Sequence, residues 1–477
     1  MELFYTPQHA RVGDVIPFFE DGVFKPFYLK NWNPYYGADR TDGWHMLATR
    51  DHLHYSETPT GIRGGTGCVL RHEGMYHMFY CKFQSTPQRQ YVWHATSPDL
   101  KQWTELPEET FGPDERYYLP TDWRDPFVFY NEEEGLWWML LCAQSVGPTA
   151  RRGCVGLCKS DDLRRWRCCE PLYAPNACMS AYECPDLFYM NGWWYLLFSQ
   201  FTDRFQTLYR MSRSLKGPWI RPRIDSFDAR AFYAAKTGAD GRRRYLYGWN
   251  PTRTQNTWRF DPEHYDGYDY NTWDWGGSMV VHELVQHADG TLGVKPVEAL
   301  PRALTVPNDL QWQPLNGAWQ VDEAVIAAQS PHAYASLISR NEVPSVCRFE
   351  TEFTFAEGTE RVGIALQVDE EFARGYYFYF EPKRQRVEWK GPLRMHEQGG
   401  WTFPHAVELE RPLKLVPNER YHVRIFVDDT TVVLYVNDCV ALSSRAYDLR
   451  ARKFGLIVSD GEAVFRNTAL YTLPQKG

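Results

Sequence analysis

Lys159–Trp166, with the sequence KSDDLRRW, is one copy of a phrase that returns along the first part of the chain. The phrase consists of a small polar residue, one or two charged residues, a leucine and an aromatic residue. The other copies are Thr49–Tyr55 (TRDHLHY), Thr96–Trp103 (TSPDLKQW) and, in a degenerate form, Ser212–Trp219 (SRSLKGPW). The leucines aligned in this way are Leu53, Leu100, Leu163 and Leu215, which makes the repeat roughly fifty residues long.

Short aromatic-rich segments, which are typical of β-strands, precede the copies. They are Pro26–Leu29, Tyr76–Cys81, Leu136–Cys142 and Trp193–Ser199, with a fifth at Tyr245–Trp249. Turn-forming pairs such as Glu73–Gly74 and Asn191–Gly192 stand between neighbouring strands. Several short strands repeated at this period predict a five-bladed β-propeller over residues 1–303, with an irregular β-sandwich as the alternative.

A proline-rich passage ends the repeat at Val294–Pro307, VKPVEALPRALTVP. Prolines this dense suit an ordered linker better than a strand. Segments with alternating apolar residues follow, among them His422–Val427 and Thr431–Val436. We therefore expect a second domain, a C-terminal β-sandwich, over residues 304–477, and an all-β protein as a whole.

The composition argues against several classes of partner. A net charge of −8 gives no electrostatic attraction to nucleic acid or to an anionic membrane. No apolar run is long enough to span a membrane, and the N-terminal residues lack the pattern of a secretion signal. The eleven cysteines match neither a zinc-binding spacing nor a disulfide framework, so free thiols in a reducing cytoplasm are expected.

Three acidic residues stand in segments that open predicted blades: Asp14 in GDVIP, Asp125 in WRDP and Glu183 in YECPD. A short apolar run follows each acid, so each is expected at the same end of an equivalent strand. The inner strands of a propeller converge, which would bring the three side chains to one mouth. Hydrolysis of a glycoside needs two such carboxyl groups, a nucleophile or base and an acid. Taken one at a time, each acid is better explained as the cap of a turn.

Together these segments resemble glycoside hydrolase family 32, the invertase and fructanase family. Arg124–Pro126 matches the family's Arg-Asp-Pro motif, and Glu183–Asp186 matches its Glu-Cys-Pro-Asp motif. Further segments that resemble the family, in order, are Phe232–Ala234 with Arg242–Asn250, Trp275–Gly277 with His282–Leu284 and Asp289–Leu292, and Tyr421–Asp438. The resemblance implies a retaining hydrolase that removes terminal β-fructofuranosyl units from short fructosides.

The resemblance also implies a role for each acid. Asp14 falls at the family's nucleophile, Glu183 matches its acid/base, and Asp125 matches the residue that holds two ring hydroxyls in the transition state. Arg124 is expected beside Asp125 as the cation that keeps this carboxylate ionised. No metal and no organic cofactor are implied. The expected partner is a small oligosaccharide, and a homo-oligomer stays open.

The opening motif departs from the family. Where the family has Trp-Met-Asn-Asp-Pro-Asn-Gly, this chain has Arg11–Pro17 (RVGDVIP), and only the acid is kept. Leu29 replaces a family glutamine, and a serine-containing segment becomes Gly65–Gly67. A site that loses partners for a substrate hydroxyl loses discrimination for it. The alternatives are a hydrolase or transglycosylase for another furanoside, such as an arabinofuranoside or a difructose, and a catalytically silent sugar-binding propeller.

Sugar contacts are expected from one arginine, one hydroxyl, one lysine and three indole rings. These residues are Arg124, Thr66, Lys30, Trp32, Trp249 and Trp275. The segment between Asn250 and Trp275 is rich in aromatic residues, so it either surrounds a leaving-group sugar or packs as a structured loop.

Overall fold

The computed structural model describes residues 2–32, 43–253, 269, 273–391, 409–450 and 453–474. These residues form antiparallel strands almost throughout, which confirms the all-β class. The chain divides into two compact units. The first unit holds Tyr5–Pro251 with Trp275–Leu292, and the second holds Met1–Phe4, Thr252–Asp274 and Gly293–Gly477.

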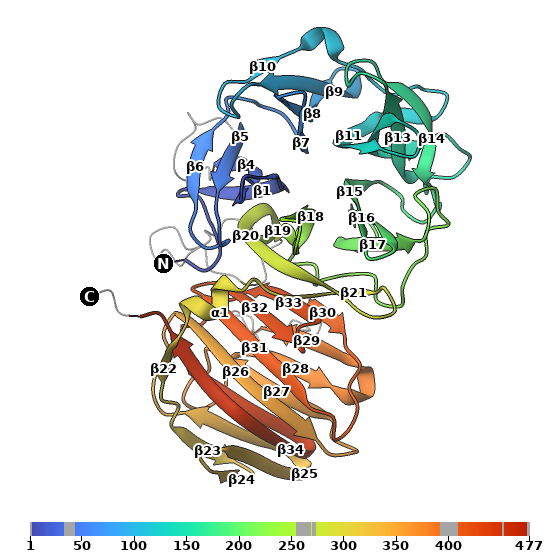
Figure 1. Cartoon of the computed structure of the whole chain (residues 1–477). Helices are drawn as coiled ribbons and strands as arrows, with labels where there is room; N and C mark the ends of the chain where they lie inside the picture. Colours follow the sequence, from blue (N-terminus) through green and yellow to red (C-terminus); the bar gives the residue numbers. More distant parts are fainter. Residues whose placement is uncertain are drawn as a thin grey trace. The chain divides into compact units, whose positions relative to one another are not determined.

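Antiparallel sheets surround a common centre in the first unit (Figure 1). One four-stranded sheet contains β7 (Gly67–His72), β8 (Met75–Ser85), β9 (Gln88–Ser97) and β10 (Thr104–Glu105). The next contains β11 (Tyr118–Asn131), β12 (Leu136–Ser145), β13 (Gly153–Ser160) and β14 (Arg167–Tyr173). A three-stranded sheet follows, with β15 (Tyr182–Met190), β16 (Trp193–Gln200) and β17 (Gln206–Ser212).

One eight-stranded sheet joins the beginning of this unit to its end. Its early strands are β1 (Ala10–Ile16), β4 (Phe27–Trp32), β5 (Gly43–Ala48) and β6 (Ser56–Pro59). Its late strands are β18 (Tyr233–Ala239), β19 (Arg244–Arg253), β20 (Trp273–Gln286) and β21 (Leu292–Pro296). Strands β2 (Phe19–Glu20) and β3 (Val23–Phe24) pair with each other, and a short 3-10 helix, η2, covers Pro107–Glu109.

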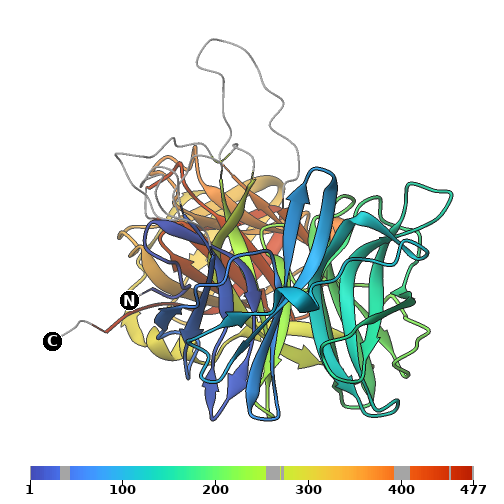
Figure 2. The same cartoon turned by 90° about the horizontal axis from the view of Figure 1, so that it is seen from above.

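The strands of the sheets run side by side, and their connecting hairpins lie at the two ends (Figure 2). In that view the blue and teal sheets, β7–β10 and β11–β14, stand next to each other. In the three smaller sheets the innermost strand comes first in the sequence, namely β7, β11 and β15. In the eight-stranded sheet both β1 and β18 face the same centre as these strands (Figure 1). Equivalent positions of these strands are therefore brought together by the fold alone.

Aromatic side chains fill the space between neighbouring sheets. Each predicted aromatic segment lies in the second strand of its group, in β4, β8, β12, β16 and β19. Trp138 and Leu140 of β12 pack in one buried cluster with Tyr182, Leu196 and Phe198 from the following sheet. This packing explains the high aromatic content of the chain, because aromatic rings bury large areas between two neighbouring sheets.

The recurring phrase is a turn that follows the third strand of a sheet. In two copies, Asp99 and Asp162 accept hydrogen bonds from backbone N–H groups two and three residues further on. The residue after the aspartate, Leu100 or Leu163, has a positive φ of 65° or 63° and a buried side chain. The phrase is thus kept for a turn geometry, with the leucine anchoring that turn in the core.

In the first copy, the sequence alignment is wrong by one residue. Asp51 accepts the same pair of backbone hydrogen bonds. The residue with the positive φ, 61°, and the buried side chain is His52, whereas Leu53 is only half-buried. His52 therefore takes the place of Leu100, and its imidazole packs 4.2 Å from the ring of Tyr245. The turn requires a positive φ and a buried side chain at the position after the aspartate, and either a leucine or a histidine can fill that position.

The second unit contains one thirteen-stranded sheet. Its strands are β22 (Val306–Asn308), β23 (Trp312–Asn316), β24 (Ala318–Val321), β25 (Val325–Ser339), β26 (Val346–Phe355), β27 (Arg361–Leu366), β28 (Tyr376–Glu381), β29 (Arg386–Lys390), β30 (Leu409–Pro412), β31 (Tyr421–Asp428), β32 (Thr431–Val436), β33 (Val440–Arg445) and β34 (Phe454–Thr472). The long strand β34 pairs with β22, β25, β26 and β27. Helices α1 (Ala299–Ala303) and η3 (Pro382–Arg384) are short.

Strands β7 and β8 approach each other very closely at Gly67. A Cβ atom on Gly67 would lie 1.8 Å from the carbonyl oxygen of Phe79, in the strand paired with it. Because this neighbour is backbone, the strands would have to separate. We expect Gly67→Ala to cost about 2 kcal/mol or more and to lower the Tm by several degrees in thermal unfolding. Gly147→Ala is the matched control, because nothing lies within 4 Å of its Cβ position. Equal Tm values for the two variants would contradict this interpretation.

Candidate active site

The three predicted acids lie at β-bulges, where the pairing of three inner strands shifts register. The pairing of β1 with β4 shifts between Gly13 and Val15, so Asp14 is an extra residue in its strand. Comparable shifts follow Arg124 in β11 and Glu183 in β15. A β-bulge of this kind bends its strand and re-aims a side chain. The bulges give the three acids an orientation that a regular strand would not give them.

Left-handed backbone marks the same places. Asp125 has a φ of 58° and Cys184 a φ of 50°, both unusual for residues other than glycine. Ala234, in a fourth bulge on β18, has a φ of 54°. Strained conformations persist only when the surroundings hold them, and they cluster at functional sites. The Cys184 conformation has a visible result, since its backbone N–H donates to Asp125 Oδ2 at 2.9 Å.

Arg124 connects two of the acid-bearing strands. Its Nη2 donates to Glu183 Oε1 at 2.9 Å, and its Nη1 donates to Asp122 Oδ1 at 2.6 Å. The sequence predicts Arg124 as the cation beside Asp125, but their closest approach is 4.0 Å, from Nε to Oδ2. The shorter ion pairs therefore join Arg124 to Glu183 and Asp122, and the contact of Arg124 with Asp125 is the longest of the three.

Asp125 is almost completely buried, with 4% of its surface exposed. Burial raises the pKa of its carboxyl, the positive charge of Arg124 lowers it, and the negative charge of Glu183 raises it further. The net direction is upward. Arg124 thus favours the ionised form of Asp125 without overcoming the effect of burial.

Asp14 titrates far above the ordinary range of an aspartate. Burial and the charge of Asp125 raise its pKa to about 7, and Glu183 adds to the rise. A hydrogen bond from Trp249 Nε1 to Asp14 Oδ1, 3.2 Å long, acts in the opposite direction, as does the charge of Lys236. Near neutral pH this carboxyl is therefore poised between its two protonation states, a condition that clusters at functional sites.

Glu183 is held on both of its carboxylate oxygens. Arg124 binds Oε1, and the hydroxyl of Tyr233 donates to Oε2 at 2.7 Å. Burial raises the pKa of Tyr233 well above 10, so its hydroxyl keeps the proton it donates. Phe205 stacks on the Tyr233 ring, with centroids 4.2 Å apart. The environment of Glu183 therefore contains a fixed cation and a fixed hydroxyl, unlike that of Asp14.

Two indole rings stand beside Asp14. Trp249 is buried, and its indole N–H donates to the carboxylate. The ring of Trp275 is exposed, and its centroid lies 6.1 Å from the centroid of the Trp249 ring. The edge of Trp275 reaches Gly13 so closely that a Cβ there would be 1.9 Å from its ring. The glycine before the acid is thus required by the position of this tryptophan.

Of the remaining predicted sugar contacts, Lys30 and Trp32 lie on β4 of the same eight-stranded sheet, and Thr66 directly precedes β7. Thr66 is buried, and its hydroxyl has no hydrogen-bond partner among the described residues. Lys30 is also buried, with its Nζ 2.8 Å from Glu57 Oε1 and 4.6 Å from the ring centroid of Trp32. A contact of Lys30 with sugar would therefore have to compete with this ion pair. The aromatic segment between residues 250 and 275 falls mostly outside the described residues.

The structure brings to the site three residues that the sequence does not single out. They are Tyr233, Asp122 and Lys236. Tyr233 could have been found, since it stands in one of the segments that carry the family resemblance. Asp122 and Lys236 give no signal, because an acid or a lysine within a strand is ordinarily solvated.

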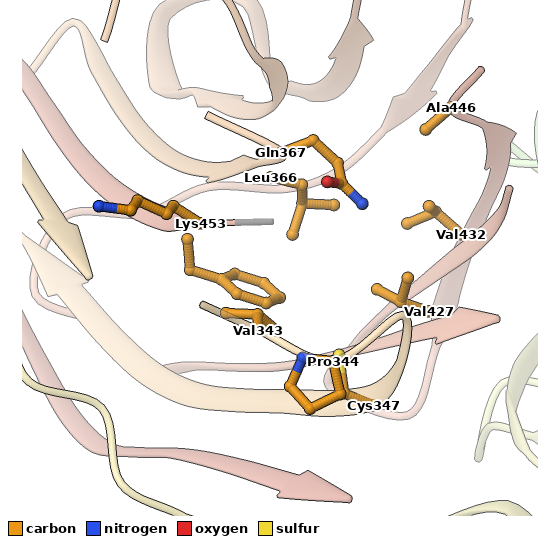
Figure 3. A pocket seen from close by; sticks show the side chains of 10 residues that line it. Val343, Pro344, Cys347, Leu366, Gln367, Val427, Val432, Ala446 and Lys453 are labelled. Atoms are coloured by element: carbon orange, nitrogen blue, oxygen red, sulfur yellow. The ribbon is translucent and has the colours of Figure 1, made fainter. Parts of the chain in front are cut away.

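No group of three or more His, Cys, Asp or Glu side chains in the described ranges is placed to hold a metal ion. None of the described helices is long and apolar enough to cross a membrane. A pocket in the second unit, lined by residues such as Val343, Cys347 and Leu366, is shown in Figure 3. Its volume of about 20 Å³ holds roughly one water molecule, too little for a sugar.

Family models match both parts of the chain. The model of the glycosyl hydrolases family 32 N-terminal domain matches residues 15–269, beginning directly after Asp14. The model of the glycosyl hydrolases family 32 C-terminal domain matches residues 326–472.

Individual proteins are similar over most of the chain. A raffinose invertase of Escherichia coli is 27% identical, over 73% of this chain and 67% of its own length. A levanbiose-producing levanase of Bacillus subtilis is 23% identical, over 97% of this chain and 89% of its own. The crystal structure of an exo-inulinase from Aspergillus awamori is similar in fold, with a TM-score of 0.71, 16% identity and coverage of 99% and 98%.

The hydrogen bond from Trp249 to Asp14 can be removed without removing an aromatic ring. In Trp249→Phe we expect the pKa of Asp14 to rise above about 7, because the carboxylate loses a donor worth about 1 kcal/mol. Carbon-13 NMR of the aspartate carboxyls measures this pKa, and Asp14→Asn identifies the signal. Trp275→Phe is the control, since the ring of Trp275 contacts Gly13 and the indole that donates to Asp14 is that of Trp249. A lower or unchanged pKa in Trp249→Phe would overturn the assignment.

Proposed function

The chain belongs to glycosyl hydrolase family 32, and we propose that it removes terminal β-fructofuranosyl units from short fructosides by double displacement, with Asp14 as nucleophile and Glu183 as acid and base. As a member of this family, with relatives named raffinose invertase and sucrose-6-phosphate hydrolase, the protein is a glycoside hydrolase of the β-fructofuranosidase type. The proposal concerns the residues, the mechanism and the sugar.

The observation that carries the proposal is the unlike surroundings of the two acids. Asp14 accepts a hydrogen bond from an indole N–H, and its pKa is raised to about 7. Glu183 is held by a guanidinium and a tyrosine hydroxyl. Two carboxyl groups in unlike environments can act one as nucleophile and one as proton carrier.

The match of the two segments to the family decides which acid takes which role, and the steps follow from that assignment. A carboxylate oxygen of Asp14 attacks the anomeric carbon of the fructosyl unit while Glu183 gives its proton to the leaving oxygen. Water, deprotonated by Glu183, then attacks the same carbon and releases Asp14, so that the configuration is retained. Asp125 accepts hydrogen bonds from two ring hydroxyls as positive charge develops on the sugar. Arg124 and the N–H of Cys184 keep that carboxylate in place.

The sugar is held, in this proposal, by Thr66 and by the indole rings. A buried hydroxyl without a partner is costly, and a sugar hydroxyl would satisfy that of Thr66. The exposed face of Trp275 gives an apolar wall beside Asp14, at the place where Gly13 has no side chain. Arg124, Lys30, Trp32 and Trp249 complete the proposed set of contacts.

The proposal also covers the number of blades, the bounds of the two domains and the location in the cell. We propose five blades, the first and the last being the two halves of the eight-stranded sheet. The propeller domain covers residues 1–303 and the sandwich domain residues 304–477. A cytoplasmic enzyme that takes imported oligosaccharides, without metal or organic cofactor, is consistent with the free cysteines.

The roles of the two acids can be separated by the leaving group. In Glu183→Gln, an activated aryl fructoside should form the glycosyl-enzyme at near wild-type rate, because an aryl oxide leaves without a proton. Its hydrolysis should stay slow, giving a burst of aryl product, and azide should restore turnover with a glycosyl azide of retained configuration. Asp14→Asn should be inactive on the same substrate, by at least about a thousandfold. Azide rescue of Asp14→Asn, with inverted product, would mean that the roles are exchanged.

The altered opening motif leads to an expectation about sucrose. Since Gly13 offers no hydrogen bond and Trp275 fills its place, the fructosyl unit loses a partner, and we expect kcat/KM for sucrose at least about tenfold below that of an invertase measured in parallel. Release of monosaccharide at matched concentrations measures the ratio. Inulobiose, levanbiose and an aryl arabinofuranoside are the comparison substrates. Invertase-like efficiency on sucrose would contradict this interpretation of Gly13.

A further inference from the structure

A buried ammonium lies close to the acids of the site. Lys236 belongs to β18, the inner strand of its sheet, and only 2% of its surface is exposed. A lysine this buried is rare unless something compensates its charge. The proposed function leaves the role of Lys236 open, and the role inferred below for this lysine rests on that function.

The side chain of Lys236 crosses the centre of the first unit. Its Nζ donates to the carbonyl oxygen of Gly67 at 2.7 Å, on the inner strand β7 of a different sheet. The ring centroid of Phe127, on the inner strand β11, is 5.9 Å from the same nitrogen. Figure 1 shows these inner strands facing one centre. The ammonium is therefore fixed among three sheets, away from water.

The carboxylates nearest to this centre share their cations unequally. Arg124 forms ion pairs with Glu183 and Asp122 and reaches Asp125 at 4.0 Å. Among the described residues, none places a basic nitrogen within 4.0 Å of Asp14, whose carboxylate accepts only the Trp249 hydrogen bond. Lys236, for its part, forms no ion pair with a described carboxylate. Within the described part of the chain, Asp14 thus lies at this centre without a basic nitrogen within 4.0 Å, and Lys236 lies there without a carboxylate partner.

Charges separated in this way still interact where water is excluded. The attraction between unit charges falls only with the first power of distance and grows as the surrounding dielectric constant decreases. The charge of Lys236 lowers the pKa of both Asp14 and Asp125, which agrees with the geometry. We propose that Lys236 is a positioning residue for the hydrolysis, and that its fixed ammonium keeps Asp14 in the carboxylate form that attacks the sugar.

Several other charged and titratable groups surround this centre. They are Asp125, Glu183, Asp186, Arg124, Tyr233, Cys68, Cys81 and Cys184. Burial raises the pKa of Cys68 to about 11 and that of Cys81 to about 12, and it raises that of Cys184 well above 9. The thiols and Tyr233 are therefore neutral at the pH of the reaction. Asp186 accepts two hydrogen bonds from Thr237, so its charge is compensated locally.

The direction of the pH effect follows from the state that must react. Asp14 has to be ionised, so kcat/KM falls as the pH decreases through the pKa of Asp14 in the free enzyme. A cation favours ionisation and moves this acid limb to lower pH. Loss of the Lys236 charge should therefore move the acid limb to higher pH, by about one pH unit, and leave the plateau above it little changed.

Two neutral variants separate the charge of Lys236 from its hydrogen bond. Lys236→Met removes both, whereas Lys236→Gln removes the charge and keeps an N–H that can donate to Gly67. In both variants we expect the acid limb of kcat/KM on a short fructoside to move to higher pH. At pH values well below the limb, kcat/KM should therefore fall about tenfold. Lys236→Arg, which keeps the charge, should keep the wild-type limb. A wild-type limb in Lys236→Gln would show a structural role only and would overturn the proposal.

A second measurement keeps this test independent of hydrolysis. Carbon-13 NMR of the Asp14 carboxyl, in the whole protein without substrate, should give a higher pKa in Lys236→Gln than in the wild type. If Lys236→Met does not fold, Lys236→Gln and Lys236→Arg carry the comparison. A wild-type protein that hydrolyses no fructoside, with the Asp14 pKa still shifted by Lys236→Gln, would reject the proposed function and not the electrostatic one. An unshifted Asp14 pKa would reject the role of Lys236.

Discussion

Negative charges held close together raise one another's free energy, and three such carboxylates lie at the centre of the first unit. Asp14, Asp125 and Glu183 lie close enough for each to affect the titration of its neighbours. Such a group persists only where donors and cations face it. The bulges on the inner strands meet this requirement, because they turn acids, amide groups and aromatic donors toward the same point. The fold is thus a scaffold for placing opposite charges and donors against three carboxylates.

Much of this arrangement could be predicted from the sequence, since each level left a pattern. The recurring phrase reflects a turn in which Asp99 or Asp162 holds two backbone N–H groups, and the aromatic segments reflect second strands packed between sheets. The three acids could be found because a short apolar run follows each of them and because two of them stand in motifs that resemble a family. Their predicted place at the same end of equivalent strands is wrong for Asp14 and Asp125, which lie inside β1 and β11, and holds only for Glu183 at the start of β15. The all-β class and the acid-bearing strands follow from these regularities.

The other features of the site depend on contacts between distant residues, which leave no repeating pattern in the sequence. The shift from Leu53 to His52 could not be seen, because the turn constrains a backbone angle and not a residue type. The bulges were also hidden, since positive φ at Asp125, Cys184 and Ala234 is set by neighbouring strands and not by glycine. The close approach of Trp275 to Gly13 joins two ends of the first unit that lie far apart in the sequence. The acids can be recognised from their own segments, whereas the groups that surround them are set by the fold.

The way in which the eight-stranded sheet closes has a consequence for synthesis. Strand β1, which carries Asp14, pairs with β20 through Val12 and Gly277. A ribosome makes β1 early and β20 only after most of the first unit, so the growing chain must keep its first strand available until a late one emerges. Closure is a contact of high sequence separation and comes slowly in folding. An unfinished polypeptide therefore bears the acid proposed as nucleophile before the tryptophans of β19 and β20 can stand beside it.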